Sequence, residues 1–155
     1  MMQRLIDQLK RHEGVKTHAY DDTAAEIDNP GKITIGVGRN IDPRGGLGLS
    51  MEEIEYLLSN DITRCMQELK TEYSWFGDLD DARSEAITNI FLNLGATRFR
   101  KFEKAISAMS VSNYDLAATE FLDSLCARQV GNRALELTYI IKTGEYVDVW
   151  VRVRD

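Results

Sequence analysis

The sequence lacks the features that mark membrane, nucleic-acid-binding and metal proteins. No apolar run approaches the ~20 residues needed to cross a bilayer, and the N-terminal stretch is charged where a secretory signal would be apolar. The two cysteines, Cys65 and Cys126, and the two histidines, His12 and His18, lack metal-ligand spacing, so we expect no metal and no cofactor. The net charge is −6 and no basic stripe exists to neutralise phosphates, which argues against a nucleic-acid-binding protein.

The composition that remains is typical of a folded, soluble protein. Hydrophobic residues make up 43% of the chain and charged residues 28%, and 155 residues are enough to bury a sizeable core. We therefore expect a globular protein of one domain or two small lobes, and we expect a monomer.

The candidate catalytic residues lie in the stretch 9–38. Apolar residues recur at helical spacing before Gly14, a natural helix stop, so we expect Glu13 at the end of a helix. A β-branched run closes the stretch after an Asn-Pro-Gly turn, which predicts a short strand carrying Thr34. With a second carboxylate at Asp22, these groups form a plausible glycosidase constellation, in which one acid donates a proton and the other stays ionised.

The motifs of this stretch resemble a known signature. His-Glu-Gly around Glu13, Ala-Tyr-Asp-Asp ending at Asp22, and Thr-Ile-Gly-Val-Gly from Thr34 to Gly38 resemble the active site of the bacteriophage lysozymes of T-even type. The resemblance implies an endolysin that hydrolyses the bond between N-acetylmuramic acid and N-acetylglucosamine in peptidoglycan. It implies that Glu13 is the general acid, that Asp22 orients the attacking water, that Thr34 helps to hold this water, and that Gly38 supports the site.

The remainder of the chain is predicted to be helical. A capping box at Ser50 and Glu53 starts a helix over about 50–70, and Asp80 caps another helix that ends at Gly95. Shorter helices are expected around 99–109, after 112–115 and after 129.

The fold class that we expect is α+β, mostly helical and lysozyme-like. The resemblance implies one domain over 1–155. It comprises a small N-terminal lobe of about 12–50 with short strands, a linking helix of about 50–70 and an all-helical lobe of about 71–155 on which the N-terminal helix packs. A long helix within one compact bundle is the alternative that the pattern leaves open.

Two residues of the helical part carry further resemblance. Ile-Phe-Leu-Asn-Leu-Gly resembles the family stretch that places an amide side chain at the cleft, here Asn93, although an Asn near a helix end can also bond its own backbone. Gly-Asn-Arg-Ala followed by Lys-Thr-Gly resembles the C-terminal signature, whose arginine, here Arg133, faces the catalytic glutamate. We expect a positional role for Arg133, through a charge-assisted bond.

The sequence departs from the family pattern near the active site. The connector from Asp22 to Thr34 is longer than the usual turn, and Arg39 stands where the best-known members have a histidine. That histidine pairs with an acid on the long helix. Because Asp61 occupies the matching place, we expect an ion pair between Arg39 and Asp61.

Two alternative functions remain at this stage. A lytic transglycosylase cleaves the same bond with one acid and no water, and a wall-binding module could share the fold without catalysis; the intact set of Glu13, Asp22 and Thr34 argues against both. The resemblance also implies synthesis in the host cytoplasm without a signal peptide, release through a holin-type lesion, and peptidoglycan as the partner, with no membrane insertion. It further points to a reaction that inverts the anomeric carbon. The acidic net charge of the chain is unexpected for an enzyme that acts on an anionic wall.

Overall fold

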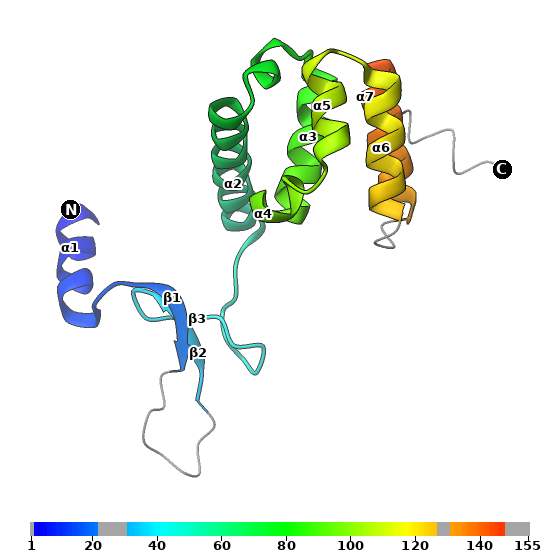
Figure 1. Ribbon diagram of the computed structural model, residues 1–155. Helices are drawn as coiled ribbons and strands as arrows, with labels where there is room; N and C mark the ends of the chain where they lie inside the picture. Colours follow the sequence, from blue (N-terminus) through cyan, green and yellow to red (C-terminus); the bar gives the residue numbers. More distant parts are fainter. Residues whose placement is uncertain (1, 22–30, 127–130, 148–155) are drawn as a thin grey trace. The chain divides into compact units, whose positions relative to one another are not determined.

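The computed structural model describes residues 2–21, 31–126 and 131–147 (Figure 1). The chain divides into two compact units, Met1–Tyr56, called here the N-terminal unit, and Leu57–Asp155, called the helical unit. The N-terminal unit holds a small sheet, and the remaining elements are mainly helices. The predicted α+β, mostly helical class is therefore confirmed.

The first helix ends where the sequence predicts. Helix α1 spans Met2–Glu13, and Gly14 follows it with φ +73°, in the left-handed region that glycine adopts without strain. The Gly14 N–H donates to the carbonyl of Lys10 at 3.1 Å, which closes the last turn. Glu13 is thus the last helical residue.

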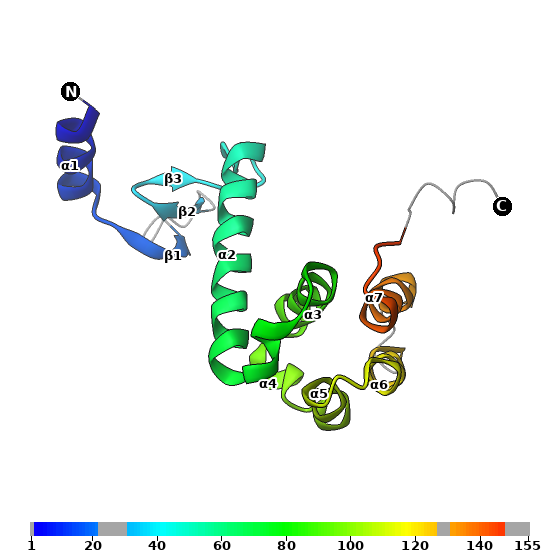
Figure 2. The same cartoon turned by 90° about the horizontal axis from the view of Figure 1, so that it is seen from above.

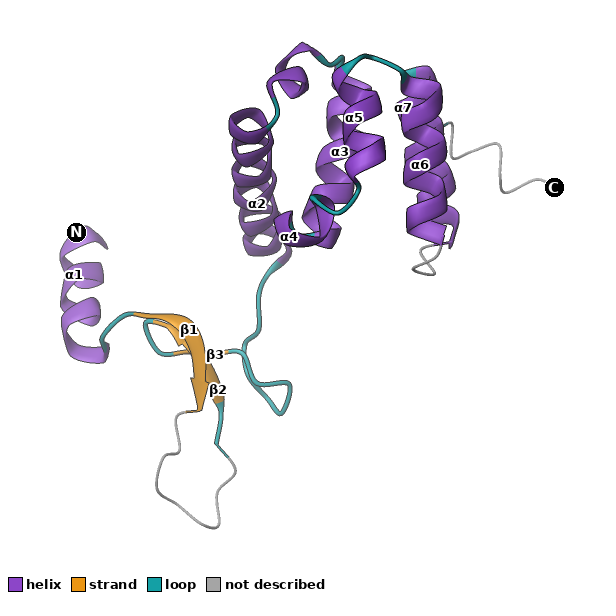
Figure 3. Ribbon diagram, in the orientation of Figure 1, coloured by secondary structure: helices purple, strands orange, loops and turns teal. Residues whose placement is uncertain are grey.

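A three-stranded antiparallel sheet follows α1 (Figure 3). Its strands are β1, Lys16–Asp21; β2, Ile33–Gly36; and β3, Arg39–Asn40. Strand β2 lies in the middle, so that Thr34 pairs with Tyr20 on one side and with Asn40 on the other. The sequence predicted β2 only. Strand β1 is exposed along most of its length and lacks an apolar alternation, and β3 is too short to leave a pattern.

Helix α2 spans Met51–Glu72 and begins with the predicted capping box. The Ser50 N–H donates to Oε2 of Glu53 at 2.8 Å, and the Glu53 N–H donates to Oγ of Ser50 at 3.3 Å. Two backbone donors of the first turn are satisfied in this way. The helix extends two residues beyond the predicted end.

In its described residues, the helical unit is built from α-helices and one 3₁₀ helix. These are η1, Ser74–Asp78; α3, Asp81–Leu94; α4, Ala96–Phe99; α5, Glu103–Ser110; α6, Tyr114–Cys126; and α7, Gly131–Thr143. Helix α6 packs against α5 and α7, and α7 packs against α3, as the view along their axes shows (Figure 2). The single helix predicted around 99–109 is divided into α4 and α5. No helix among the described residues combines the length and apolar character of a membrane span.

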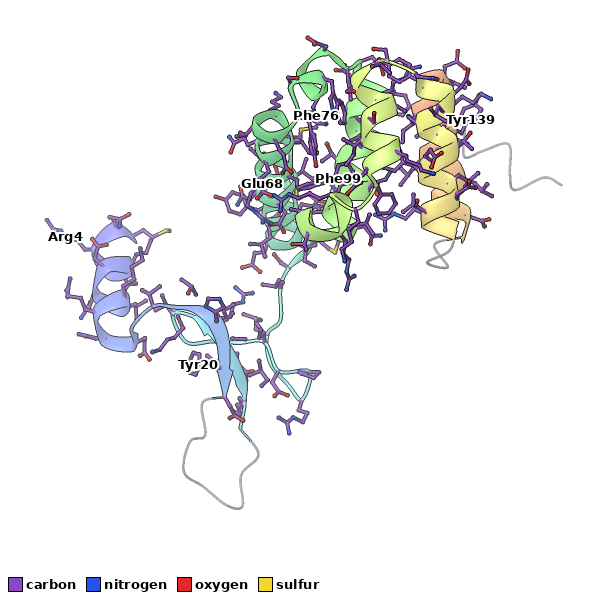
Figure 4. The ribbon with its side chains drawn as sticks, viewed as in Figure 1. Arg4, Tyr20, Glu68, Phe76, Phe99 and Tyr139 are labelled. Atoms are coloured by element: carbon purple, nitrogen blue, oxygen red, sulfur yellow. The ribbon has the colours of Figure 1, made fainter. Side chains whose placement is uncertain are left out.

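The helical unit has an aromatic core centred on Phe99, which is fully buried (Figure 4). The ring of Phe99 lies 5.3 Å from that of Phe91, 5.8 Å from that of Tyr73 and 6.0 Å from that of Phe121, measured between centroids. These separations are typical of stabilising aromatic pairs. The core joins α3, α4 and α6 with the segment that follows α2.

Arg83, near the start of α3, connects three helices. Its Nε donates to the carbonyl of Ile141 at 2.8 Å and its Nη2 to that of Lys142 at 3.1 Å, which satisfies two carbonyls at the end of α7. Its guanidinium also lies 3.9 Å from the centroid of the Tyr114 ring on α6. The arginine thus links α3, α6 and α7.

Candidate functional site

The predicted general acid, Glu13, lies beside a glycine turn. A methyl group placed on Gly38 would lie 3.8 Å from Oε2 of Glu13. Gly38 has φ +73° and belongs to the turn between β2 and β3. The end of α1 and this turn therefore bring together two of the residues that the sequence predicts for the site.

The predicted water-binding residue, Thr34, lies on the central strand and has only 3% of its surface exposed. Its hydroxyl donates to the carbonyl of Lys32 at 3.2 Å. A hydroxyl that donates one hydrogen bond keeps lone pairs with which to accept others. Thr34 can therefore still accept a hydrogen bond from a water molecule that reaches it.

The predicted second carboxylate, Asp22, lies outside the described residues. Its neighbour Asp21 is the last residue of β1 and pairs with Ile33, which precedes Thr34 on β2. Most of the long connector that sets this chain apart from the family pattern also falls within the segment 22–30, outside the described residues. The role of Asp22 stays a prediction.

Arg39, directly after Gly38, binds Glu53 and not the predicted Asp61. Its Nη1 and Nη2 lie 2.5 and 2.8 Å from Oε1 and Oε2 of Glu53, and its Nε donates to the carbonyl of Gly48 at 2.8 Å. Asp61 instead pairs with Arg64 at 2.7 Å. The predicted pair is wrong because the capping glutamate, at the start of the same helix, presents both oxygens to the guanidinium.

A buried carboxylate stabilises the turn after β3. Asp42 is 2% exposed and accepts hydrogen bonds from the Arg44 side chain, from the Arg44 N–H and from the N–H of Ile33 on β2. The Arg44 side chain is the first cause that holds the pKa of Asp42 well below its usual range. The carboxylate thus ties this turn to the strand that carries Thr34.

Gly46 completes the same turn. A Cβ atom there would lie 2.6 Å from Oδ1 of Asn40 and from backbone atoms of Asp42. Glycine avoids this clash because it has no Cβ. The sequence argument did not predict these contacts. The run of Asn, Asp and Gly was the available signal, because these side chains hydrogen-bond to nearby backbone in turns.

In the helical unit, Arg133 binds an amide that the sequence interpretation missed. Its Nε and Nη2 donate to Oδ1 of Asn89 on α3, at 3.1 and 2.5 Å. Asn93, the predicted amide, lies one turn further along α3. The periodicity of that helix was the only signal for Asn89, because positions four residues apart share a face. The prediction that Arg133 faces Glu13 concerns two different units, and it stays a prediction.

Arg133 and Asn89 border a hollow of about 500 Å³ within the helical unit. It is lined by Leu58, Ile62, Met66, Glu85, Thr88, Asn89, Leu92 and Arg133. Its apolar side chains come from α2 and α3, and its charged groups are Glu85 and Arg133. A pocket with an apolar floor and a few convergent polar groups is suited to bind a ligand or a side chain.

Comparison with known proteins places the chain in a family. The sequence profile of the phage lysozymes matches residues 10–135, a range that contains every predicted site residue. The chain belongs to the phage lysozyme family. Within the parts of the chain that the structure describes, no group of three His, Cys, Asp or Glu side chains is arranged to hold a metal ion.

Known members of the phage lysozyme family resemble the chain over most of its length. Probable T4-type lysozymes 1 and 2 of Dictyostelium discoideum are each 26% identical to it, and the alignments cover 93% of this chain and 96% of theirs. The pre-baseplate central spike protein Gp5 of Enterobacteria phage T4 is 27% identical over 97% of this chain and 29% of its own. Identity at this level leaves room for exchanges such as Arg39 within the family pattern.

Proposed function

We propose that this protein is a lysozyme that hydrolyses the β-1,4 bond between N-acetylmuramic acid and N-acetylglucosamine in bacterial peptidoglycan. The observation that carries the proposal is the position of Glu13 at the end of α1, beside the Gly38 turn of the sheet that carries Thr34. Membership of the phage lysozyme family supports it, as do the T4-type lysozymes among the relatives.

Glu13 is the general acid in this proposal. It donates a proton to the oxygen of the leaving sugar, so that the glycosidic bond breaks without expelling an alkoxide. Gly38 lies against the carboxyl group and, lacking a side chain, leaves that side open. Proton donation of this kind accelerates reactions ~10²- to 10⁴-fold, so the loss of Glu13 should be plain in an activity assay.

Asp22 is the base in this proposal, and it stays ionised. It orients the water that attacks the anomeric carbon from the opposite face of the sugar, and it accepts the proton that this water loses. Thr34 helps to hold the water through its hydroxyl. Because the attack comes from the face opposite the leaving group, the configuration at the anomeric carbon inverts.

Arg133 and Asn93 play supporting parts in the proposal. Arg133 is held by Asn89 and contributes a fixed positive charge, whereas Asn93 offers an amide that can hydrogen-bond to the glycan. We further propose that the two units work as a single lysozyme-like domain, without metal or cofactor, in a monomer. The enzyme reaches the wall from the host cytoplasm through a holin-type lesion.

The first test is lysis of permeabilised bacterial cells, followed as a fall in turbidity. Wild type should clear the suspension, and Glu13→Gln should fail to do so because an amide of the same shape cannot donate the proton. Asp7→Asn is the matched control, since Asp7 lies on the same helix and its carboxylate accepts a hydrogen bond from the side chain of Gln3, four residues earlier. Clearance by Glu13→Gln at the wild-type rate would refute the assignment.

The second test identifies the first-formed product. A hydrolase leaves a reducing end, whereas a lytic transglycosylase leaves an anhydro sugar, and a wall-binding module leaves the glycan intact. NMR of the fresh product should show the α-anomer from the β-linked glycan. A β-anomer would mean that an Asp acts as a nucleophile, as in retaining enzymes, where the carboxyl groups lie ~5 to 5.5 Å apart instead of ~6.5 to 9.5 Å.

A further inference from the structure

We propose that Arg39, with its partner Glu53, is a positioning residue that holds the glycine turn against the carboxyl group of the general acid. The proposal rests on the proposed function, because it takes Glu13 as the acid. Arg39, which departs from the family pattern, thereby gains a role in the geometry of the site.

The turn that faces Glu13 is closed by the pairing of Ile35 with Arg39, but it offers few side chains that could fix its orientation. Gly36 and Gly38 both have left-handed backbones, with φ +68° and +73°, and neither carries a side chain that could pack. Glycine has the widest choice of backbone conformations of any residue. Contacts from outside the turn can therefore fix its orientation, and Arg39 is the first residue after it.

The Arg39 side chain makes three directed hydrogen bonds. Two form a fork with the carboxylate of Glu53, and the third goes from Nε to the carbonyl of Gly48. A planar guanidinium opposite a carboxylate fixes orientation as well as distance, because both pairs of atoms must line up together. These bonds thereby fix the orientation of the Arg39 backbone, and of the turn before it, relative to Glu53 and Gly48.

The acceptor is itself held rigidly. Oε2 of Glu53 accepts from Nη2 of Arg39 and from the N–H of Ser50, both at 2.8 Å, so the same carboxylate also caps α2. The N–H of Glu53 donates in turn to the Ser50 hydroxyl. The first turn of α2 is thus the anchor, and Arg39 transmits its position to the turn beside Glu13.

Stability alone gives a weak reason for this arrangement. The side chains of Arg39 and Glu53 are 31% and 40% exposed, and ion pairs that water reaches in this way add little to folding stability. The effect of the ion pair on reaction rate, through the position of the turn, is the larger one, since a misplacement of ~1 Å in an active site can cost ~10²-fold in rate.

A matched pair of substitutions separates positioning from stability. Arg100 also binds a carboxylate through two nitrogens, that of Glu72 in the helical unit, with Nε to Oε1 at 2.7 Å and Nη2 to Oε2 at 2.9 Å. We compare Arg39→Met and Arg39→Lys with Arg100→Met and Arg100→Lys. For each variant, kcat and KM are measured on soluble peptidoglycan oligomers, and Tm is measured by calorimetry.

The proposal predicts a fall in kcat confined to the Arg39 variants. Arg39→Met should lose ~10- to 100-fold in kcat with KM within ~2-fold of wild type, because geometry and not glycan binding has changed. Arg39→Lys should fall as well, since an ammonium group cannot form the fork. The Arg100 variants should lower Tm to a similar degree and leave kcat within ~2-fold.

Two results would overturn the proposal while the proposed function stands. Unchanged kcat in both Arg39 variants would show that the turn holds itself, and a raised KM at constant kcat would mean that Arg39 binds the glycan directly. An inactive wild type would overturn the proposed function first, which distinguishes the two failures. Should Arg39→Met not fold, Glu53→Gln provides the same test, because the amide keeps its shape and loses the charge that the fork requires.

Discussion

Two glycines, Gly36 at the end of β2 and Gly38 in the turn that follows it, offer a strict test of the site beside Glu13. Both Gly36 and Gly38 have left-handed backbones, so replacement of either by alanine forces an L-residue into a disfavoured conformation. The cost is ~1 to 2 kcal/mol at each position. Their surroundings differ, because a methyl group on Gly38 would lie 3.8 Å from Oε2 of Glu13, whereas one on Gly36 would meet nothing within 4 Å.

The two variants should therefore lose the same stability and differ in activity. At ~2 to 4 °C per kcal/mol for a protein of this size, each should lower Tm by ~2 to 8 °C. A methyl group at 3.8 Å is in ordinary van der Waals contact, so Gly38→Ala does not push the carboxyl group away. It does occupy the space on one side of the acid through which a glycan oxygen could approach.

The assay combines calorimetry with clearance of permeabilised cells. Gly38→Ala should clear ~10-fold more slowly than wild type, since reaction requires close approach in one orientation, whereas Gly36→Ala should stay within ~2-fold. Measurement well below both Tm values keeps unfolded protein from contributing. Equal clearance rates for the two variants would refute the position of Gly38 at the acid, and so would a greater loss in Gly36→Ala.

Two further predictions concern stability and thiol chemistry. Hydrogen bonds from Arg100 hold the pKa of Glu72 below its ordinary 4.5, so the ionised form favours the folded state. The stability that it adds is present above the ordinary pKa and is lost as pH falls through the lowered pKa of the folded state. Urea unfolding measured from about pH 6 to 3 should show this loss of stability. If the free energy of unfolding depended on pH in Arg100→Met as it does in wild type, the prediction would be contradicted. Burial is the main cause that raises the pKa of the Cys65 thiol, so in a Cys126→Ser variant the remaining thiol should resist alkylation in the folded protein at neutral pH and react fully in denaturant. Equal labelling rates in the folded and denatured protein would refute its burial.

Short-range signals in the sequence determined where the main elements begin and end. Gly14 placed Glu13 at a helix end, the capping box at Ser50 placed the start of α2, and Asp80 accepts a hydrogen bond from the N–H of Arg83 at 2.9 Å, as a helix cap should. Each signal works over three or four residues, because a cap satisfies donors within a single turn. The β-branched run around Thr34 was visible for a similar reason, since strand preference depends on neighbouring side chains.

Only the tertiary structure decided which side chains meet across the chain. Arg83 binds the carbonyl of Ile141, 58 residues away, and Arg133 binds Asn89, 44 residues away, and no local pattern announces either contact. The sequence argument paired Arg39 with Asp61. The structure pairs it with Glu53, because the turn after β3 and the start of α2 bring these two together. Such pairings follow from chain closure and packing, which the order of residues alone does not reveal.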